Sequence, residues 1–312
     1  DHRDLHSFPT RRSSDLLFFL ICLNSVGYTV KIEKRLLYDR HTLHDTYKYG
    51  KQERRFQWDK ISAFLDSLMV FQAKNDGYGV LRNYKNVNGI PPLSRKYKTN
   101  KYKQTQDSFG VDRSQGIPLY RRGNFSVPER YGRDGAYVAV ISDSAGCFQV
   151  SSATFAGEWY VPKKYMKLIG PLSIKKVIFV DRTNQNIATL EQEGATWLVR
   201  SMNPVTTGAN RPPYQEATPP GIYFVQRKLS EMLYLKDGTD EKGGFAPYAC
   251  RFTGGAYLHG VPVNYPDNKL IEYSWTLGTT PRSHMCVRNA TSHAKFMYDW
   301  AEVEKTLVIV FD

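Results

Sequence analysis

The sequence predicts a mainly β protein. From Ile174 to the end of the chain, short apolar stretches alternate with Gly, Asn and Pro turn signals, a pattern typical of strands joined by tight turns. The 312 residues are 41% hydrophobic and 23% charged, which excludes a wholly disordered or collagen-like chain. Four cysteines in this length are too few for a disulfide framework. The length allows about two domains.

The N-terminal end is expected to lie outside the fold. Residues 6–16 read HSFPTRRSSDL, which resembles the translation of a sequencing-library adapter, so we interpret residues 1–15 as a non-biological scar rather than a disordered leader. Residues 16–27 begin with an apolar run that is too short for a membrane span of about 20 residues. They predict a truncated secretory signal, and therefore an exported protein of the periplasm or cell envelope without a stable membrane span in its mature form. A buried strand or helix is the alternative.

Positive charge is concentrated in the front part of the chain. Residues 28–130 carry 21 basic and 10 acidic side chains, whereas residues 131–312 carry 19 and 17. A polyanion should therefore bind to residues 28–130 rather than to the rest of the chain. Lysines alternate there with Tyr97 and Tyr102, a combination that could line a nucleic-acid groove. We favour a solvated loop, or one that touches an anionic wall polymer, and expect no nucleic acid partner.

Residues 28–115 predict a basic region of helix and loops. Apolar side chains between Lys51 and Lys74 recur at spacings of three and four, which indicates an amphipathic helix that packs against another element. They are Phe56, Ile61, Phe64, Leu65, Leu68 and Phe71. Residues 75–115 have neither helical nor strand periodicity and predict loops.

Residues 116–170 predict a small β-barrel. The stretches GIPLY, GAYVAVISD, GCFQVSS and GEWYVPKKYMKLI are short, apolar and separated by turn signals. Together they are similar to the Src-homology-3-like barrels that accompany bacterial cell-wall enzymes, chiefly in residues 158–166. Cys147 is expected there as a small buried residue.

Residues 174–312 predict a second, larger β domain. Its expected strands are IKKVIFVDR, QNIATLEQ, TWLVRSMN, GIYFVQRKL, MLYLK, AYLHG and TLVIVF. One helix is expected at TSHAKFMYDWAEV, with Thr291 and Ser292 as its caps.

Cys286 is the strongest candidate for a chemical role. A thiol attacks only as thiolate, so it needs a base in reach and donors for the oxyanion that it creates. Candidate bases are His259, His284 and His293. A papain-like arrangement, with the base far downstream, is disfavoured because only His293 follows, seven residues later. Zinc binding by these histidines with Cys250 is an alternative, but the spacings match no familiar metal signature. We expect no metal, and a structural role for Cys250.

The sequence around these residues resembles the L,D-transpeptidase (YkuD-type) catalytic domain. The family pattern is His-Gly, then after a gap Ser-His-Gly-Cys, an apolar residue and Arg or Asn. This chain has HG at 259–260 and SHMCVR at 283–288. TPPGIYFV, the hairpin IKKVIFVDRTNQNIATLEQEG and TLVIV also match in order, so the resemblance spans residues 174–311. It implies an L,D-transpeptidase-like β-sandwich over residues 174–312.

The resemblance also implies roles. Cys286 would be the nucleophile, His259 the general base and His284 a supporting residue. Backbone N–H groups of residues 284–286 would lie near the oxyanion. The other implied residues are Ser283 and Arg288, which would order the loop or meet a substrate carboxylate, and Gly260, whose carbonyl would orient the His259 ring. Strand alternation places Tyr257 on the same face as His259, where it would line the pocket.

Two features depart from the family pattern. Met285 replaces the glycine before the nucleophile, and a methionine resists a positive φ or a close approach of substrate. His259 and Cys286 are 27 residues apart, so residues 261–278 are expected to add a lid or hairpin.

The resemblance implies an exported peptidoglycan L,D-transpeptidase. Its substrates would be peptidoglycan stem peptides: a tetrapeptide stem acylates Cys286 with loss of the terminal D-alanine, and an amine acceptor resolves the thioester. No metal or organic cofactor is needed for this acyl transfer. The alternatives are an L,D-carboxypeptidase, in which water is the acceptor, and an inactive wall-binding protein.

Overall fold

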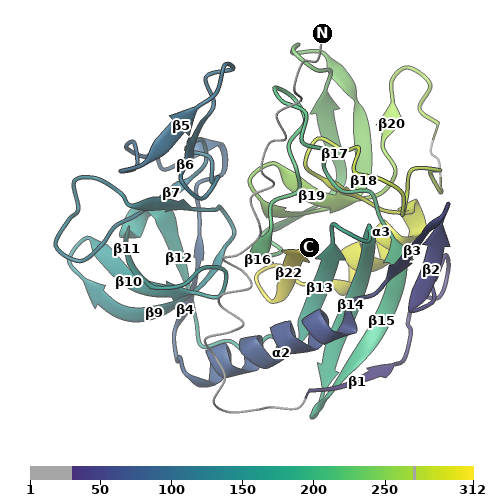
Figure 1. Cartoon of the computed structure of the whole chain (residues 1–312), viewed down its shortest axis with the longest axis horizontal. Helices are drawn as coiled ribbons and strands as arrows, with labels where there is room; N and C mark the ends of the chain where they lie inside the picture. Colours follow the sequence, from purple (N-terminus) through teal and green to yellow (C-terminus); the bar gives the residue numbers. More distant parts are fainter. Residues whose placement is uncertain (1–29, 270–271) are drawn as a thin grey trace, which may run out of the picture.

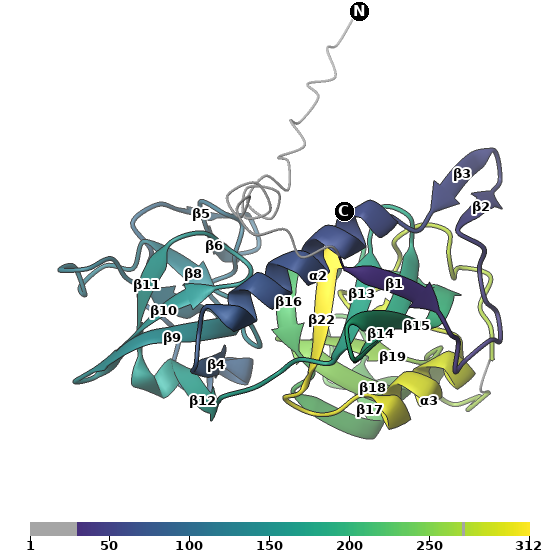
Figure 2. The same ribbon diagram turned by 90° about the horizontal axis from the view of Figure 1, so that it is seen from below.

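The computed structural model describes residues 30–269 and 272–312. The expected scar at 1–15 and signal segment at 16–27 lie outside these residues. The mainly β prediction is confirmed. Figure 1 shows two modules, a smaller N-terminal one built on one sheet and a larger one with two stacked sheets, with helix α2 (Trp58–Ala73) running beside both (Figures 1 and 2).

The larger module is centred on a six-stranded sheet with the order β1-β15-β14-β13-β22-β16. Its central strands β13 and β22 are parallel and buried on both faces, which explains their continuous apolar sequences. The strands are β1 (Lys31–Lys34), β13 (Lys176–Asp181), β14 (Asn186–Glu193), β15 (Thr196–Pro204), β16 (Gly221–Phe224) and β22 (Thr306–Phe311).

Alternate residues of β13 enter two separate cores. Val177 and Phe179 pack in the core under α2, whereas Ile178 and Val180 pack against the second sheet. Because successive strand side chains point to opposite faces, the six-stranded sheet is the middle of three layers. The amphipathic helix is confirmed, with its buried side chains on the expected face. It begins only at Trp58, since the preceding residues form the hairpin of β2 (Thr46–Tyr49) and β3 (Gln52–Arg55).

The second sheet has the order β17-β18-β19-β21, and β20 pairs with β18. Its strands are β17 (Arg227–Leu235), β18 (Lys242–Thr253), β19 (Ala256–His259), β20 (Val263–Asn264) and β21 (Val287–Arg288). Helix α3 (Thr291–Trp300) follows β21 and confirms the second predicted helix. Its N-cap is Ala290, so the expectation that Thr291 and Ser292 cap it is wrong: both are helical residues.

The N-terminal module contains a five-stranded sheet with the order β11-β10-β9-β4-β12. The strands are β4 (Tyr78–Leu81), β9 (Tyr137–Ser144), β10 (Cys147–Ser152), β11 (Glu158–Pro162) and β12 (Met166–Gly170), with the short helix η2 (Lys163–Tyr165) before β12. β4 lies in a segment that we predicted as loop, so the sheet begins well before the expected boundary at residue 116. Four residues are too few to show a period of two. The Src-homology-3-like interpretation stays a prediction.

A long connection, residues 82–136, joins β4 to β9. It contains the short helix η1 (Tyr84–Asn86), the hairpin of β5 (Tyr97–Thr99) and β6 (Thr105–Asp107), and the pair β7 (Ile117–Leu119) and β8 (Arg130–Gly132). The expectation of helix and loop alone over residues 28–115 is therefore wrong, because this region also contains β1 to β6. This connection faces the larger module (Figure 1).

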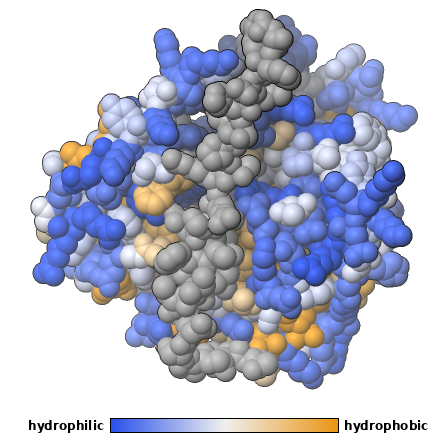
Figure 3. All heavy atoms as spheres, in the orientation of Figure 1, coloured by the Kyte–Doolittle hydropathy of each residue, from blue (hydrophilic) through white to orange (hydrophobic). Residues whose placement is uncertain are grey.

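The surface seen in Figure 3 is mostly hydrophilic, with small apolar patches between the polar side chains. Within residues 30–269 and 272–312, no helix has the length and apolar character needed to cross a membrane.

Candidate active site

The register of β19 and β21 brings the candidate nucleophile and base to one face of the second sheet. His259 is paired with Arg288, and Leu258 with Val287. The same parallel register places Cys286 opposite Tyr257. Cys286 immediately precedes β21. Because alternate residues of a strand share a face, continuation of this register puts Cys286 on the face of His259, two residues away along the sheet.

The thiol of Cys286 is enclosed by backbone groups. Its Sγ lies 3.6 Å from the carbonyl oxygen of Gly255, to which the S–H donates, and the backbone N–H of Tyr257 contacts the sulfur. Burial raises the pKa of Cys286 to about 11, although the Tyr257 N–H and the nearby Arg288 oppose that change. The resting residue is therefore a neutral thiol at neutral pH.

The ring of His259 has a defined tautomer. Its Nδ1 lies 2.6 Å from the carbonyl oxygen of Gly260, and because a carbonyl only accepts, Nδ1 carries the proton. His259 is 3% exposed, and this burial lowers the pKa of its ring to about 4. The hydrogen bond to Gly260 favours the charged form and opposes that change. The imidazole is neutral, and Nε2 keeps the lone pair that a base needs.

The loop before Cys286 has an unusual backbone conformation. Met285 has a φ of 137°, in the region that favours glycine, so the methionine adopts the conformation that we expected it to resist. A non-glycine residue in this conformation destabilises the folded state by about 1–3 kcal/mol, and it persists only where surrounding contacts hold it. Here the Thr218 hydroxyl donates to the Met285 carbonyl at 2.7 Å, and the Ser283 hydroxyl donates to the Cys286 carbonyl.

Arg288 and His284 have contrasting surroundings. The partly buried guanidinium of Arg288 has no ion pair or hydrogen bond with any described residue, and burial lowers its pKa. His284 lies at the surface, with Nε2 3.0 Å from Asp237 Oδ2 in the loop between β17 and β18. The structure thus gathers Cys286, His259, Tyr257 and Arg288 on one face and leaves the His284 ring outside that group.

Comparison with known proteins connects this geometry to a family. The family model described as the L,D-transpeptidase catalytic domain (YkuD) matches residues 175–310. This segment belongs to the L,D-transpeptidase catalytic domain family. No curated protein matches this chain.

Three solved structures illustrate the similarity. An L,D-transpeptidase from Mycobacterium smegmatis has 17% identity and a TM-score of 0.37, over 55% of this chain and 80% of that one. An L,D-transpeptidase from Stackebrandtia nassauensis has 25% identity and a TM-score of 0.32, over 44% and 56%. A fused Zn-dependent amidase/peptidase/peptidoglycan-binding domain-containing protein from Clostridium acetobutylicum has 20% identity and a TM-score of 0.32, over 44% and 52%. The chain therefore spans about half the length of the Clostridium protein.

In the L,D-transpeptidase domain, His293 is a buried support and not a base. Its Nδ1 lies 3.1 Å from Asn289 Oδ1, and its Nε2 lies 2.9 Å from Ser201 Oγ. The Asn289 backbone N–H donates to the carbonyl of His259 at 2.9 Å, and its side-chain amide donates to that of Val287 at 3.0 Å. Burial lowers the pKa of His293 to about 3. Sequence reasoning assigned no role to Asn289, although it directly follows the SHMCVR motif.

The residues between His259 and Cys286 lie beside the site. After β20, the chain turns back so that the N–H of Gly278 donates to the carbonyl of Val205 at 2.8 Å. Trp275 is 71% exposed, and Arg282 lies over its ring. Of the segment expected to add a lid or hairpin, Val263 and Asn264 form β20, which pairs with β18. A role as a lid stays a prediction.

A cleft of about 1450 Å³ separates the N-terminal module from the L,D-transpeptidase domain. The long connection 82–136 lines one wall, and the loops around Glu216, Gly255 and Met285 line the other. Two of its lining residues neighbour the thiol, since Gly255 accepts from Cys286 Sγ and Met285 precedes Cys286 in the chain. Among the described residues, no three His, Cys, Asp or Glu side chains are grouped as metal ligands.

Proposed function

We propose that the protein is an exported peptidoglycan L,D-transpeptidase, with Cys286 as nucleophile and His259 as general base. The observation that carries the proposal is the β19–β21 register, which puts a thiol and a neutral imidazole on one face of one sheet, inside a segment that matches the family.

The chemistry is a two-step acyl transfer. His259 Nε2 takes the thiol proton as Cys286 Sγ attacks the carbonyl carbon of the third residue of a tetrapeptide stem. The peptide bond to the terminal D-alanine breaks, the imidazolium returns its proton to the leaving amine, and a thioester remains. An amine of a second stem then attacks the thioester, loses a proton to His259, and releases the thiol with a new peptide bond.

The electrostatics favour a neutral pair at rest. The pKa of Cys286 is raised to about 11 and that of His259 is lowered to about 4, so neither group is charged at pH 7. The proton therefore transfers during attack and not beforehand. In the described part of the chain no protein group accepts from the backbone N–H of His284 or Cys286, so both can donate to the oxyanion.

Arg288 and the cleft account for substrate binding in this proposal. A partly buried guanidinium without a protein partner is suited to a carboxylate, which it can bind through two parallel hydrogen bonds. A stem peptide carries such carboxylates. Gly255 and Met285 line the cleft and neighbour Cys286, so an extended peptide bound in the cleft would pass close to the thiol.

The exposed β5–β6 hairpin would contact anionic wall polymers. Its lysines at 96, 98, 101 and 103 have no ion pair among the described residues, and Tyr97 and Tyr102 are exposed beside them. Binding of the protein to purified sacculi should weaken with salt, and should weaken at low salt when these lysines are changed to glutamine.

Acylation by a carbapenem tests the proposed nucleophile. Intact-mass spectrometry should show one adduct on the wild type and on Cys250→Ala, a buried control, and none on Cys286→Ala. A folded wild type that stays unmodified contradicts the proposal.

Muropeptide analysis then identifies the acceptor. Cross-linked dimers indicate an amine, whereas trimmed monomers alone would indicate the L,D-carboxypeptidase alternative. Equal binding of wild type and Cys286→Ala to sacculi, without turnover by either, would indicate an inactive wall-binding protein.

A further inference from the structure

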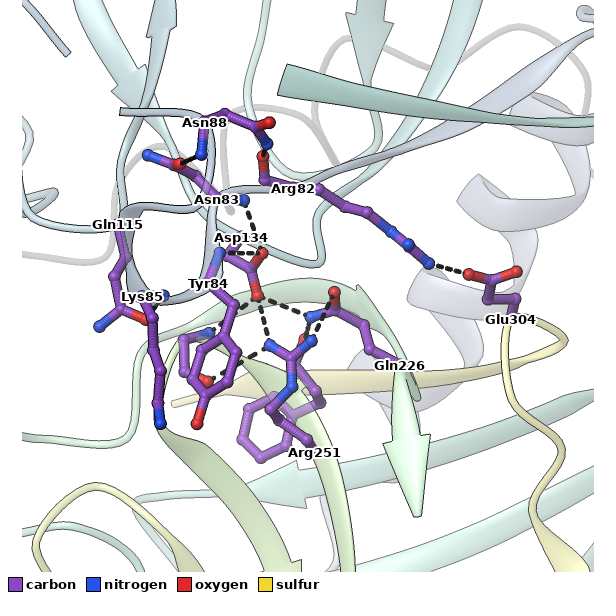
Figure 4. Close-up of polar contacts among 12 residues, drawn as sticks. Arg82, Asn83, Tyr84, Lys85, Asn88, Gln115, Asp134, Gln226, Arg251 and Glu304 are labelled. Carbon is purple, nitrogen blue, oxygen red and sulfur yellow. Dashed lines mark hydrogen bonds and ion pairs between the residues drawn. The ribbon is translucent and has the colours of Figure 1, made fainter. Parts of the chain in front are cut away.

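Asp134 joins the two modules at a buried point. It belongs to the N-terminal module and is 2% exposed. Its Oδ1 accepts from the backbone N–H groups of Asn83 and Tyr84 at 2.8 and 3.1 Å. Its Oδ2 accepts from three groups of the larger module: Arg251 Nη1 at 2.6 Å, Gln226 Nε2 at 2.8 Å and the N–H of Gly254 at 3.2 Å. Figure 4 shows this carboxylate between the turn at Asn83 and Tyr84 and the Arg251 guanidinium.

The backbones of the two modules are in close contact beside Asp134. Gly135 follows Asp134, and its carbonyl accepts from the N–H of Phe224 at 2.9 Å. A Cβ on Gly135 would lie 2.0 Å from the Phe252 carbonyl oxygen. The backbones therefore touch, and the position of the N-terminal module determines where the carboxylate meets the β18–β19 turn.

That turn leads directly to the thiol. Asp134 holds the N–H of Gly254, and the carbonyl of the next residue, Gly255, accepts from Cys286 Sγ. The held turn thus supplies one wall of the nucleophile's surroundings.

A second route runs along a row of side chains. Arg251 is paired with Tyr257 across β18 and β19, and the β19–β21 register continues the row to Cys286. Tyr84 of the N-terminal module covers this row. Its ring lies 4.2 Å from the Arg251 guanidinium carbon, and burial together with the nearby Tyr84 hydroxyl raises the pKa of Tyr257.

We propose that the N-terminal module completes the active site, and that Asp134 and Tyr84 are positioning residues that fix the Gly254–Gly255 turn and Tyr257 around Cys286. The inference rests on the proposed function for its meaning in catalysis, because it assigns these residues to acyl transfer at Cys286. The effect of Asp134 on the reactivity of the Cys286 thiol can be tested whether or not the proposed function holds.

The variants Asp134→Asn and Tyr84→Phe separate the two routes, and Tyr160→Phe, on β11 of the N-terminal module, is the matched control. Tyr84→Phe keeps the buried ion pair, so it stays informative if Asp134→Asn folds poorly. Acylation by a carbapenem is followed at increasing concentration, which gives a maximal rate and a half-saturating concentration. Iodoacetamide labelling mapped by peptide mass spectrometry gives the reactivity of Cys286, with Cys250, 1% exposed, as an internal reporter of unfolding.

We expect the maximal acylation rate to fall about tenfold in Asp134→Asn and about threefold in Tyr84→Phe, with the half-saturating concentration within about twofold. Cys250 should stay unlabelled, and Tyr160→Phe should match the wild type. Wild-type maximal rates in both variants overturn the proposal. So does a loss of rate that appears only together with labelling of Cys250, because that result shows general unfolding.

If the wild type takes no carbapenem adduct, the proposed function fails and the labelling still decides the inference. Iodoacetamide labelling follows the protonation of the thiol and does not need the geometry that acylation requires, so its rate can rise while acylation slows. Release of the Gly255 carbonyl removes a contact that favours the protonated thiol, so Cys286 of Asp134→Asn should label about threefold faster while Cys250 stays unlabelled. Equal labelling of Cys286 in Asp134→Asn and wild type overturns the inference.

Discussion

The hydroxyl of Thr218 donates a 2.7 Å hydrogen bond to the carbonyl oxygen of Met285 and accepts one of 2.8 Å from the backbone N–H of Gly208. Thr218 belongs to the segment TPPG that precedes β16, whereas Met285 precedes the candidate nucleophile. One buried hydroxyl therefore ties the entry of edge strand β16 to the loop that carries Cys286, and holds Met285 at its positive φ.

Thr218→Val should destabilise the protein and slow acylation. Valine keeps the shape but leaves the Met285 carbonyl and the Gly208 N–H without their partner, a loss of about 1–3 kcal/mol. Urea unfolding and the rate of carbapenem acylation measure the two effects. Thr239→Val, in an exposed loop, should change neither; a Thr218→Val protein as stable and as reactive as the wild type would show that the tie is dispensable.

Gly208→Ala should prevent the nucleophile loop from packing. A Cβ there would lie 2.3 Å from the Glu216 carbonyl oxygen and 2.7 Å from Met285 Cα, both backbone atoms that cannot move aside. We expect loss of acylation and a lower unfolding midpoint. Gly77→Ala, whose Cβ would meet nothing closer than 3.9 Å, is the control for a glycine change as such. Full activity in Gly208→Ala would contradict the packing.

Acid should destabilise the fold through buried histidine. Burial lowers the pKa of His293 to about 3, below its unfolded value of about 6.5. The contribution of neutral, buried His293 to the free energy of unfolding is complete above pH 6.5. It is lost as pH falls toward 3, by up to about 1.4 kcal/mol per pH unit for such a group. Urea unfolding between pH 7 and 4 measures the slope. His293→Gln should reduce it and exposed His44→Gln should not; an unchanged slope in His293→Gln would mean that His293 does not cause it.

Arg288→Gln should weaken donor binding more than chemistry. The guanidinium has no protein partner to leave behind, so its removal should spare folding while it takes away the carboxylate contact. We expect the half-saturating concentration of a tetrapeptide donor to rise about tenfold, with a smaller change in maximal rate. Arg227→Gln, an exposed change on β17, is the control. If donor binding is unaffected in Arg288→Gln, the guanidinium does not contact the donor.

The elements that the sequence predicted well are those whose pattern is local. β13 and β22 are continuous apolar runs because both faces are buried, and α2 shows its apolar stripe over sixteen residues. β4 was missed because its four residues are all buried and too short to show a period. β1 was missed for a similar reason: it is a short edge strand that is recognised only once β15 lies beside it.

The same distinction applies to the site. Cys286 and His259 lie in short motifs, so sequence alone proposed them together. Asp134 and Arg251 are 117 residues apart, in separate modules, and neither has a distinctive neighbourhood in the sequence. Only the docking of the two modules makes them partners. His284 belongs to the motif, yet its ring points to Asp237, because a motif fixes backbone position and not where a side chain points.

Helix α2 has a consequence for how this chain can be divided. Its Phe64 packs on Phe179 and Phe311 of the central sheet, while Phe71 packs on Tyr78 and Tyr137 of the N-terminal module. The family match begins at residue 175, so a fragment cut at that point would lose the apolar cover of one whole face of its sheet. Transfer of this domain to another protein therefore requires a cut upstream of β1, which makes the entire described chain the smallest portable unit.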